Sequence, residues 1–261
     1  MLQSPEKKAA ISLLPVSQSF PFSWIPWLTA IGGMFLVFAV LTWLMLTHAD
    51  VQAFDQLCKD TMKAHAQNHG GVRNFFWLVT WLGGVVGLTL LATVGTVTMF
   101  LRKEYLLAGI WVLATAGGAL LNLGVKHSVN NPRPLQTDRD PSVAWITNPS
   151  FPSGHAMGSA IGLGMCLVVA LRFLKKKRSR ILISAAVILL ILLIGFSRIY
   201  LRAHWFTDVV GGFTLAAAWL VCCLALLNRI EMSLAQTPAL AKAVVGPEVP
   251  PVALVPGAPD S

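Results

Sequence analysis

Charged side chains are scarce in this chain of 261 residues: only 12% are Asp, Glu, Lys or Arg, whereas 55% are hydrophobic. Soluble domains carry roughly 25% charged residues. So low a charge content excludes an ordinary soluble domain and predicts a membrane protein. Carboxylates are scarcer than cations, with 11 Asp and Glu against 20 Lys and Arg, so the formal net charge is +9.

Cysteine is also scarce, and its spacing excludes the sites that it most often builds. No C-x-x-C pair occurs among the 4 cysteines, which are Cys58, Cys166, Cys222 and Cys223. This spacing predicts neither a disulfide framework nor a zinc site. The excess of cations does not indicate nucleic acid either, because Lys and Arg lie in short stretches between apolar segments. Such stretches are typical of topology signals and of contacts with anionic membrane lipids.

Long apolar runs, by contrast, are plentiful. A membrane-spanning helix needs about 20 mostly apolar residues. Six runs fit this requirement: Trp27–Thr47, Phe76–Phe100, Tyr105–Val125, Ala156–Leu174, Ile181–Ser197 and Asp208–Leu227. The sequence therefore predicts an all-α protein, built as a bundle of six transmembrane helices. The first run begins too late and is too long for a cleaved signal peptide.

The apolar runs divide the chain into three parts. Residues 26–229 form the predicted membrane domain, which follows a cytoplasmic N-terminal segment of residues 1–25. Residues 230–261 are rich in proline and small residues, which predicts a disordered cytoplasmic tail. Inside the domain, the polar segment Val51–Gly71 is expected to form a helix at the membrane surface.

Basic residues in short loops orient the predicted spans. The run Lys175–Arg180 lies between the fourth and fifth spans and is expected to stay in the cytoplasm. The loop between spans three and four, and the loop between spans five and six, then lie on the opposite side. We expect a multi-pass protein of a bacterial inner membrane, in which these two loops face the periplasm or the outside.

Three short strings concentrate polar chemistry in these two loops. They are Lys126–Pro134 (KHSVNNPRP), Pro152–His155 (PSGH) and Ser197–Asp208 (SRIYLRAHWFTD). The first two belong to one loop and the third to the other, so all three fall on the same face of the membrane. The sequence predicts that they assemble a single site.

The cations of these strings are the groups that bind phosphate. Arg133 and Arg198 suit bidentate contact with phosphate oxygens, and Lys126 supplies a compact charge. The prolines on both sides of Arg133 stiffen its loop. Alternative interpretations are a lysine at a helix end that reaches for the interface, and an arginine that is a plain loop charge.

Ser153, Gly154 and His155 come directly before an apolar helix. Helix N-terminal amides bind anions, Ser153 is a good helix cap, and Gly154 lets a phosphate approach the backbone. Ser153 as a cap needs no further function. His155 is costly at the head of a membrane helix without a role, and it titrates near neutrality, so we interpret it as a proton donor.

His204 and Asp208 are four residues apart, on one face if the segment is helical. Asp208 can hold one imidazole nitrogen as N–H, which leaves the other nitrogen free to attack phosphorus. A structural His–Asp cap pair is the alternative. No group of carboxylates accompanies the strings, so we expect a mechanism without a metal or other cofactor. The other polar residues near the strings or in polar loops are given lesser roles: His48, His65, His69, His127, Asp138, Arg139 and Asp140.

In order and spacing, the strings K-x6-RP, PSGH and SR-x5-H-x3-D resemble the three-part signature of the type 2 phosphatidic acid phosphatase family, which includes the soluble vanadium haloperoxidases. No signature position between Lys126 and Asp208 departs from it. The resemblance implies a six-helix membrane fold with its site at the outer surface. It implies that His204 becomes a phosphohistidine, that Asp208 orients it and that His155 protonates the leaving group. The residues it implies for phosphate binding are Lys126, Arg133, Ser153, Gly154 and Arg198.

The expected function is a metal-independent lipid phosphatase with a lipid phosphate as substrate and membrane lipids as surroundings. Undecaprenyl diphosphate or phosphatidic acid leads as the substrate type, and phosphatidylglycerophosphate and lipid A phosphates also occur in the family. A phosphotransferase that uses a lipid acceptor shares the first half-reaction. A non-catalytic binder or transporter would need only the cations, and the six apolar runs argue against a haloperoxidase.

Overall fold

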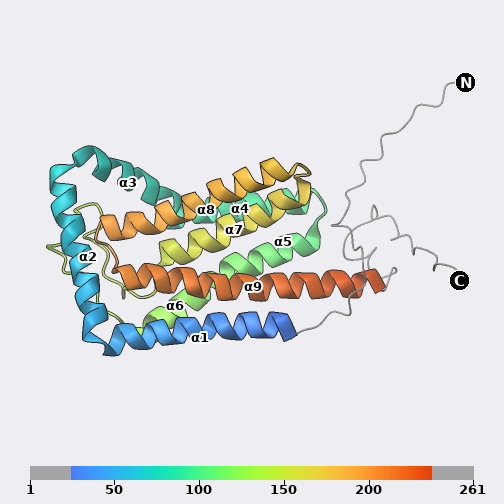
Figure 1. Cartoon of the computed structure of the whole chain (residues 1–261). Coiled ribbons are helices and arrows are strands. Elements are labelled where there is room, and N and C mark those ends of the chain that lie inside the picture. The colour runs from blue at the N-terminus through green and yellow to red at the C-terminus, as the bar shows by residue number, and fades with distance from the viewer. Residues whose placement is uncertain (1–24, 237–261) are drawn as a thin grey trace, which may run out of the picture.

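The computed structural model describes residues 25–236, which form a bundle of helices without a strand (Figure 1). The helices, in chain order, are α1 (Ile25–Thr47), α2 (Ala49–Asn68), α3 (Gly70–Leu82), α4 (Val85–Leu101), α5 (Tyr105–Val112), the π-helical turn η1 (Leu113–Gly117), α6 (Gly118–Val129), α7 (Gly154–Phe173), α8 (Lys177–Tyr200) and α9 (Phe206–Gln236). The prediction of an all-α fold is confirmed.

Among residues 25–236, five helical segments are long and apolar enough to cross a membrane, and there are six if the bent pair of α3 and α4 counts as one span. The segment Tyr105–Val129 joins α5, η1 and α6 into one span. Only 6% of the apolar window of α1 is buried inside the protein, so most of its side chains face outward, as lipid-facing positions do. Each of the six predicted spans therefore corresponds to one of these segments or to the bent pair, with shifted boundaries.

The second span differs most from the prediction, which gave Phe76–Phe100 as one span. It is bent by 41° between α3 and α4. Gly83 follows the last residue of α3, and Gly84 precedes the first residue of α4. A Cβ at Gly83 would lie 2.3 Å from the side chain of Ile194, so this bend brings backbone against α8 where only glycine fits.

The other boundaries shift at the ends of the chain and in the fifth span. Helix α8 has 24 residues, so the fifth span is longer than the predicted run Ile181–Ser197. Residues 230–236, which the sequence assigned to the tail, are helical because α9 continues to Gln236. The rest of the predicted tail and nearly all of the predicted N-terminal segment lie outside the described residues.

Helix α7 occupies the middle of the bundle (Figure 1). Its Met157, Ile161 and Met165 are at most 2% exposed and pack in one cluster with Trp111 of α5 and Leu215 of α9. Burying these side chains fixes the axis and depth of α7 in the bundle. The N-terminus of α7, which carries the PSGH string, is thereby fixed as well.

The polar helix α2 crosses one end of the bundle, as expected of a surface helix (Figure 1). Its Lys59 and Lys63 donate to Asp138 over 2.7 and 2.6 Å, and these hydrogen bonds lower the pKa of the Asp138 carboxyl to about 2. Arg73 of α3 donates to Asp140 over 2.6 Å. Asp138 and Asp140 therefore tie the long loop between α6 and α7 to α2 and α3, which is their structural role.

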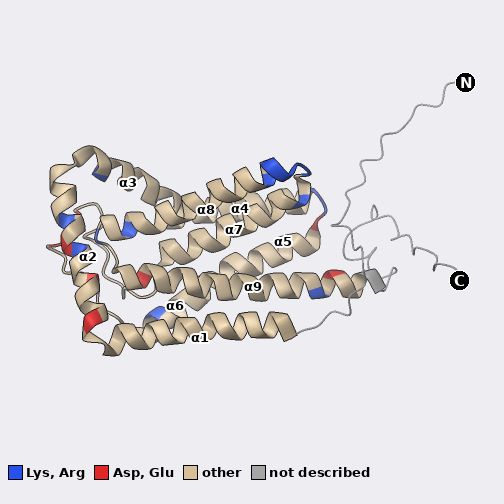
Figure 2. Cartoon of the chain, viewed as in Figure 1, with Lys and Arg blue, Asp and Glu red and all other residues tan. Residues whose placement is uncertain are grey.

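Cations gather at the opposite end of the bundle, where α7 is followed by α8 (Figure 2). This cluster is the predicted basic run, with Lys175 and Lys176 in the connection and Lys177 at the start of α8. The basic run and helix α2 thus lie at opposite ends of the membrane domain.

Candidate active site

All three sequence strings meet at the end of the bundle that α2 crosses. Lys126 lies in the last turn of α6 and Arg198 in the last turn of α8. Gly154 and His155 begin α7, and Asp208 lies in the first turn of α9. The remaining predicted residues, Arg133, Ser153 and His204, belong to the loops that join these helix ends.

His204 lies between Asp208 and Arg133. Its Nδ1 is 3.1 Å from Oδ2 of Asp208, and its Nε2 is 3.0 Å from Nη1 of Arg133. A guanidinium only donates hydrogen bonds, so Nε2 must be the acceptor and Nδ1 must carry the hydrogen that Asp208 accepts. This tautomer leaves the lone pair of Nε2 directed at a cation, where a phosphate would bind.

His204 and Asp208 were expected to share a face if their segment was helical; the segment is not helical at His204, yet the two side chains do touch. His204 lies in a turn, and α9 begins only at Phe206. The turn starts at the end of α8, where Ala203 N–H donates to Arg198 O over 2.9 Å. Arg202 has a φ of 55°, and its side chain donates to the carbonyls of Tyr200 and Asp138. These bonds hold a left-handed residue in place and turn His204 back toward the bundle.

The guanidinium of Arg133 is held by Asn148. Its Nε donates to Asn148 O over 2.8 Å and its Nη2 to Asn148 Oδ1 over 2.7 Å. Its Nη1 donates to Ala203 O over 2.5 Å, beside His204. Burial is the main reason that the pKa of Arg133 falls to about 10. The group stays charged at neutral pH.

Lys126 and Arg198 are the buried cations of the site, 4% and 2% exposed. The Lys126 ammonium donates to the carbonyls of Pro149, Ser150 and Pro152 over 2.7 to 3.1 Å. Nη1 of Arg198 donates to Thr80 Oγ1 over 2.6 Å, while its buried Nε has no hydrogen-bond partner among the described residues. A buried cationic N–H without a partner is suited to an anionic ligand.

The start of α7 completes the site. Ser153 caps α7 by accepting from Ala156 N–H over 3.4 Å, and its own N–H donates to the carbonyl of Asp208 over 2.9 Å. Gly154 is the first residue of α7, and a Cβ there would lie 3.4 Å from Oδ1 of Asn122, an ordinary van der Waals distance. The His155 ring lies beside the bend between α3 and α4, with Cδ2 3.4 Å from the place of a Gly83 Cβ.

Three polar residues of the site were not predicted from the sequence: Thr80, Asn148 and Ser150. Ser150 makes a short hydrogen bond to Asp208 Oδ2 and lies 3.4 Å from His204 Nδ1. Asn148 holds Arg133, and Thr80 accepts from Arg198. Nothing in the local pattern distinguished these residues from loop or helix polar residues. They were detectable only through the contacts that the fold makes.

Residues 107–231 match the model of the PAP2 superfamily. The chain carries a PAP2 superfamily domain. The resemblance read from the strings is thus confirmed, and every string residue lies inside the matched range. Helices α1 to α4, which precede Tyr105, lie before the matched range.

One curated relative and one solved structure, both from Bacillus subtilis, resemble the chain. Phosphatidylglycerophosphatase B of Bacillus subtilis (strain 168) is 38% identical over 132 residues, which cover 49% of this chain and 61% of the relative. The crystal structure described as the first transmembrane PAP2 type phosphatidylglycerolphosphate phosphatase from Bacillus subtilis matches with a TM-score of 0.68 and 25% identity. That match covers 77% of this chain and 98% of the other.

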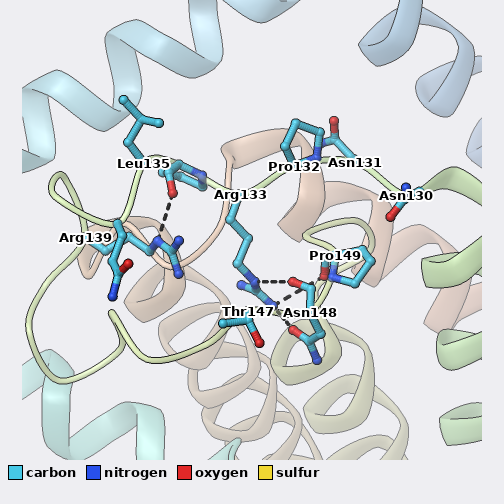
Figure 3. A pocket seen from close by; sticks show the side chains of 11 residues that line it. Asn130, Asn131, Pro132, Arg133, Leu135, Arg139, Thr147, Asn148 and Pro149 are labelled. Carbon is cyan, nitrogen blue, oxygen red and sulfur yellow. Dashed lines mark hydrogen bonds between the residues drawn. The ribbon is translucent and has the colours of Figure 1, made fainter.

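A cavity of about 430 Å³ borders the PAP2 domain's Arg133 (Figure 3). Amide, guanidinium and proline side chains dominate its lining, and none of its lining residues is acidic: Asn130, Asn131, Pro132, Arg133, Pro134, Leu135, Gln136, Arg139, Thr147, Asn148 and Pro149. The lining therefore suits water and anions. Among residues 25–236, no group of three or more His, Cys, Asp and Glu side chains is placed to hold a metal ion.

The His204 ring should be neutral at pH 6.5, where a free imidazole is about half protonated. Its burial, followed by the charges of Arg133, Arg198 and Lys126, lowers the pKa of His204 well below its ordinary value. Below about pH 6.5 the unfolded chain therefore binds more protons at His204 than the folded protein does. The stabilisation of the folded protein by a neutral His204 is present above about pH 6.5 and is lost as the pH falls below it.

Histidine-selective ¹⁵N NMR in detergent measures the ring charge, and His204→Gln identifies the signal. A His204 ring that is half protonated at or above pH 6.5 would contradict the arrangement described here.

Proposed function

We propose that this protein is a multi-pass membrane phosphatase that removes phosphate from a lipid phosphate through a phosphohistidine at His204. One observation carries the proposal: Nε2 of His204 presents its lone pair to Arg133, while Asp208 holds Nδ1. A His–Asp cap pair would not need a buried imidazole surrounded by cations. A simple phosphate binder would not need a nitrogen nucleophile oriented in this way.

In the proposed first step, the phosphate oxygens take over N–H groups of Arg133, Arg198 and Lys126. Nε2 of His204 attacks phosphorus and the bond from phosphorus to the lipid oxygen breaks, with His155 donating its proton to that oxygen. The imidazole becomes a phosphorylated imidazolium, whose Nδ1–H stays bound to Asp208. The cations stabilise the charge on the three phosphoryl oxygens, which is the main part of such catalysis.

In the second step, water attacks phosphorus and gives its proton to His155, which the first step left neutral. The bond from phosphorus to Nε2 breaks, the lone pair returns to His204 and orthophosphate leaves. The polar cavity beside Arg133 supports water as the acceptor, because it gives the aqueous phase a route to that face of the site. A lipid acceptor has no comparable feature in its favour.

For the substrate, we propose a phosphatidylglycerophosphate type of lipid. This choice rests on the name of the relative, of which the alignment spans 61%. It replaces undecaprenyl diphosphate and phosphatidic acid, which the sequence alone placed first. The motif residues contact the phosphate and do not select the lipid, so those two lipids remain the competitors.

Purified protein in detergent should release orthophosphate from phosphatidylglycerophosphate, and the activity should survive excess EDTA because cationic side chains and amides stabilise the phosphoryl group.

His204→Ala should lower turnover by at least about 10³-fold, since no neighbour replaces a covalent nucleophile. His127→Ala is the matched control, because His127 is exposed beside Lys126.

Phosphate release can be measured over a panel with phosphatidic acid and undecaprenyl diphosphate. Loss of activity in EDTA that magnesium restores would overturn the metal-free mechanism. Near-normal turnover in His204→Ala would overturn the assignment of the nucleophile. A preference for another panel lipid would replace the substrate while leaving the mechanism in place.

We also propose that the site faces the extracytoplasmic side. The basic run that begins α8 lies at the end of the bundle opposite to α2 and the site (Figure 2). Basic residues in short loops resist translocation, so the end with Lys175–Arg180 stays inside. The site then meets substrate in the outer leaflet.

Single cysteines placed at the exposed positions Thr137 and Lys176 test this orientation, after Cys58 has been replaced. An impermeant thiol reagent should label the Thr137 position in intact cells, and should label the Lys176 position only after lysis. The reverse pattern would place the site in the cytoplasm.

A further inference from the structure

Helix α2 reaches the site through one carboxylate, that of Asp55. Asp55 is 5% exposed, and both of its oxygens accept from Thr207: Oδ1 from the backbone N–H over 3.0 Å and Oδ2 from the hydroxyl over 2.5 Å. Thr207 is the second residue of α9, and Asp208 follows it. The residue next to Asp208 is therefore held by a different helix.

This contact acts as a helix cap supplied from another element. The first N–H groups of a helix have no partner inside the helix, and a carboxylate there satisfies them and interacts favourably with the helix dipole. Asp55 does this for α9. A buried carboxylate is otherwise costly, so its place here fixes the start of α9 relative to α2.

The start of α9 in turn determines the geometry around His204. Oδ2 of Asp208 accepts three hydrogen bonds. They come from Ser150 Oγ, from His204 Nδ1 over 3.1 Å and from the backbone N–H of Trp205 over 2.9 Å. A shift of the first turn of α9 would disturb all three contacts together. Small displacements of a catalytic pair can reduce rates by about 10²-fold.

We infer that Asp55 is a positioning residue for the His204–Asp208 pair and that α2 is a functional part of the site. The inference rests on the proposed function. It adds to the PAP2 domain a helix that precedes the matched residues 107–231. Asp55 does not contact His204 and acts on it through Thr207 and Asp208.

Other contacts should keep α2 in place when Asp55 is changed. Phe54 and Phe206 meet edge to face, with ring centroids 5.3 Å apart. Lys59 and Lys63 still bind Asp138 on the neighbouring loop. Loss of the Asp55 contact should therefore loosen the first turn of α9 without undocking the helix.

The test compares Asp55→Asn, Thr207→Val and the double variant with the conservative Thr207→Ser. Asp60→Asn is the matched control, because Asp60 lies on the same helix with its side chain 56% exposed. Readouts are kcat and KM for phosphate release, and the ¹⁵N signal of the His204 ring. The ring signal reports the Nδ1–H bond to Asp208 without requiring activity.

Asp55→Asn and Thr207→Val should each lower kcat by about tenfold to hundredfold with KM nearly unchanged, because the phosphate-binding cations are untouched. The double variant should be no more impaired than the more impaired single variant, since both changes weaken the same pair of hydrogen bonds. Thr207→Ser should retain activity. The His204 signal should move in the impaired variants and stay in place in Asp60→Asn.

An unchanged kcat and ring signal in Asp55→Asn would overturn the inference, as would an equal loss in Asp60→Asn. Additive losses in the double variant would also overturn it, because they would mean separate roles. If the wild type releases no phosphate from any panel lipid, the proposed function fails. The positioning role then stands if the His204 signal moves in Asp55→Asn and falls if it does not.

Discussion

Cations crowded around one imidazole are the constraint on which the rest of this structure depends. Lys126 and Arg198 are buried, and Arg133 is within 3.0 Å of His204. Like charges repel and each loses hydration, so such a group is unfavourable in an apolar bundle unless carbonyls, a carboxylate or an anion compensate it. The Lys126 ammonium donates hydrogen bonds to backbone carbonyls in the loop before α7, and Asp208 accepts a hydrogen bond from His204. A bound phosphate would complete the balance.

The fold supports this arrangement from two directions. Inside the membrane domain, the tightly packed α7 fixes the depth of Ser153 and His155. At the same end of the bundle, α2 and α3 hold the loop between α6 and α7 through Asp138 and Asp140, and α2 holds the start of α9 through Thr207. Loops that carry a site are usually the mobile part of a protein. Here ion pairs and caps tie them to helices, which suits a site that must keep its cations aligned.

Much of this could be predicted from the sequence, because hydropathy and the phosphate strings are local signals. Length and apolarity located the spans, and charge type and spacing selected the eight candidate residues that the fold brings together. The bend at Gly83, the turn that carries His204, and the roles of Asn148 and Ser150 could not be predicted. Each depends on a contact between residues far apart in the chain, such as Gly83 against Ile194. Propensity and periodicity contain no information about such contacts.

The proposed function depends on the transfer of the phosphoryl group to Nε2 of His204. The most direct measurement is a rapid quench of the protein with ³²P-labelled lipid phosphate, followed by mass spectrometric mapping of the labelled peptide. We expect an acid-labile, alkali-stable adduct on Nε2 of His204, formed before phosphate is released. Label on another residue, or a burst of lipid product without labelled protein, would contradict it.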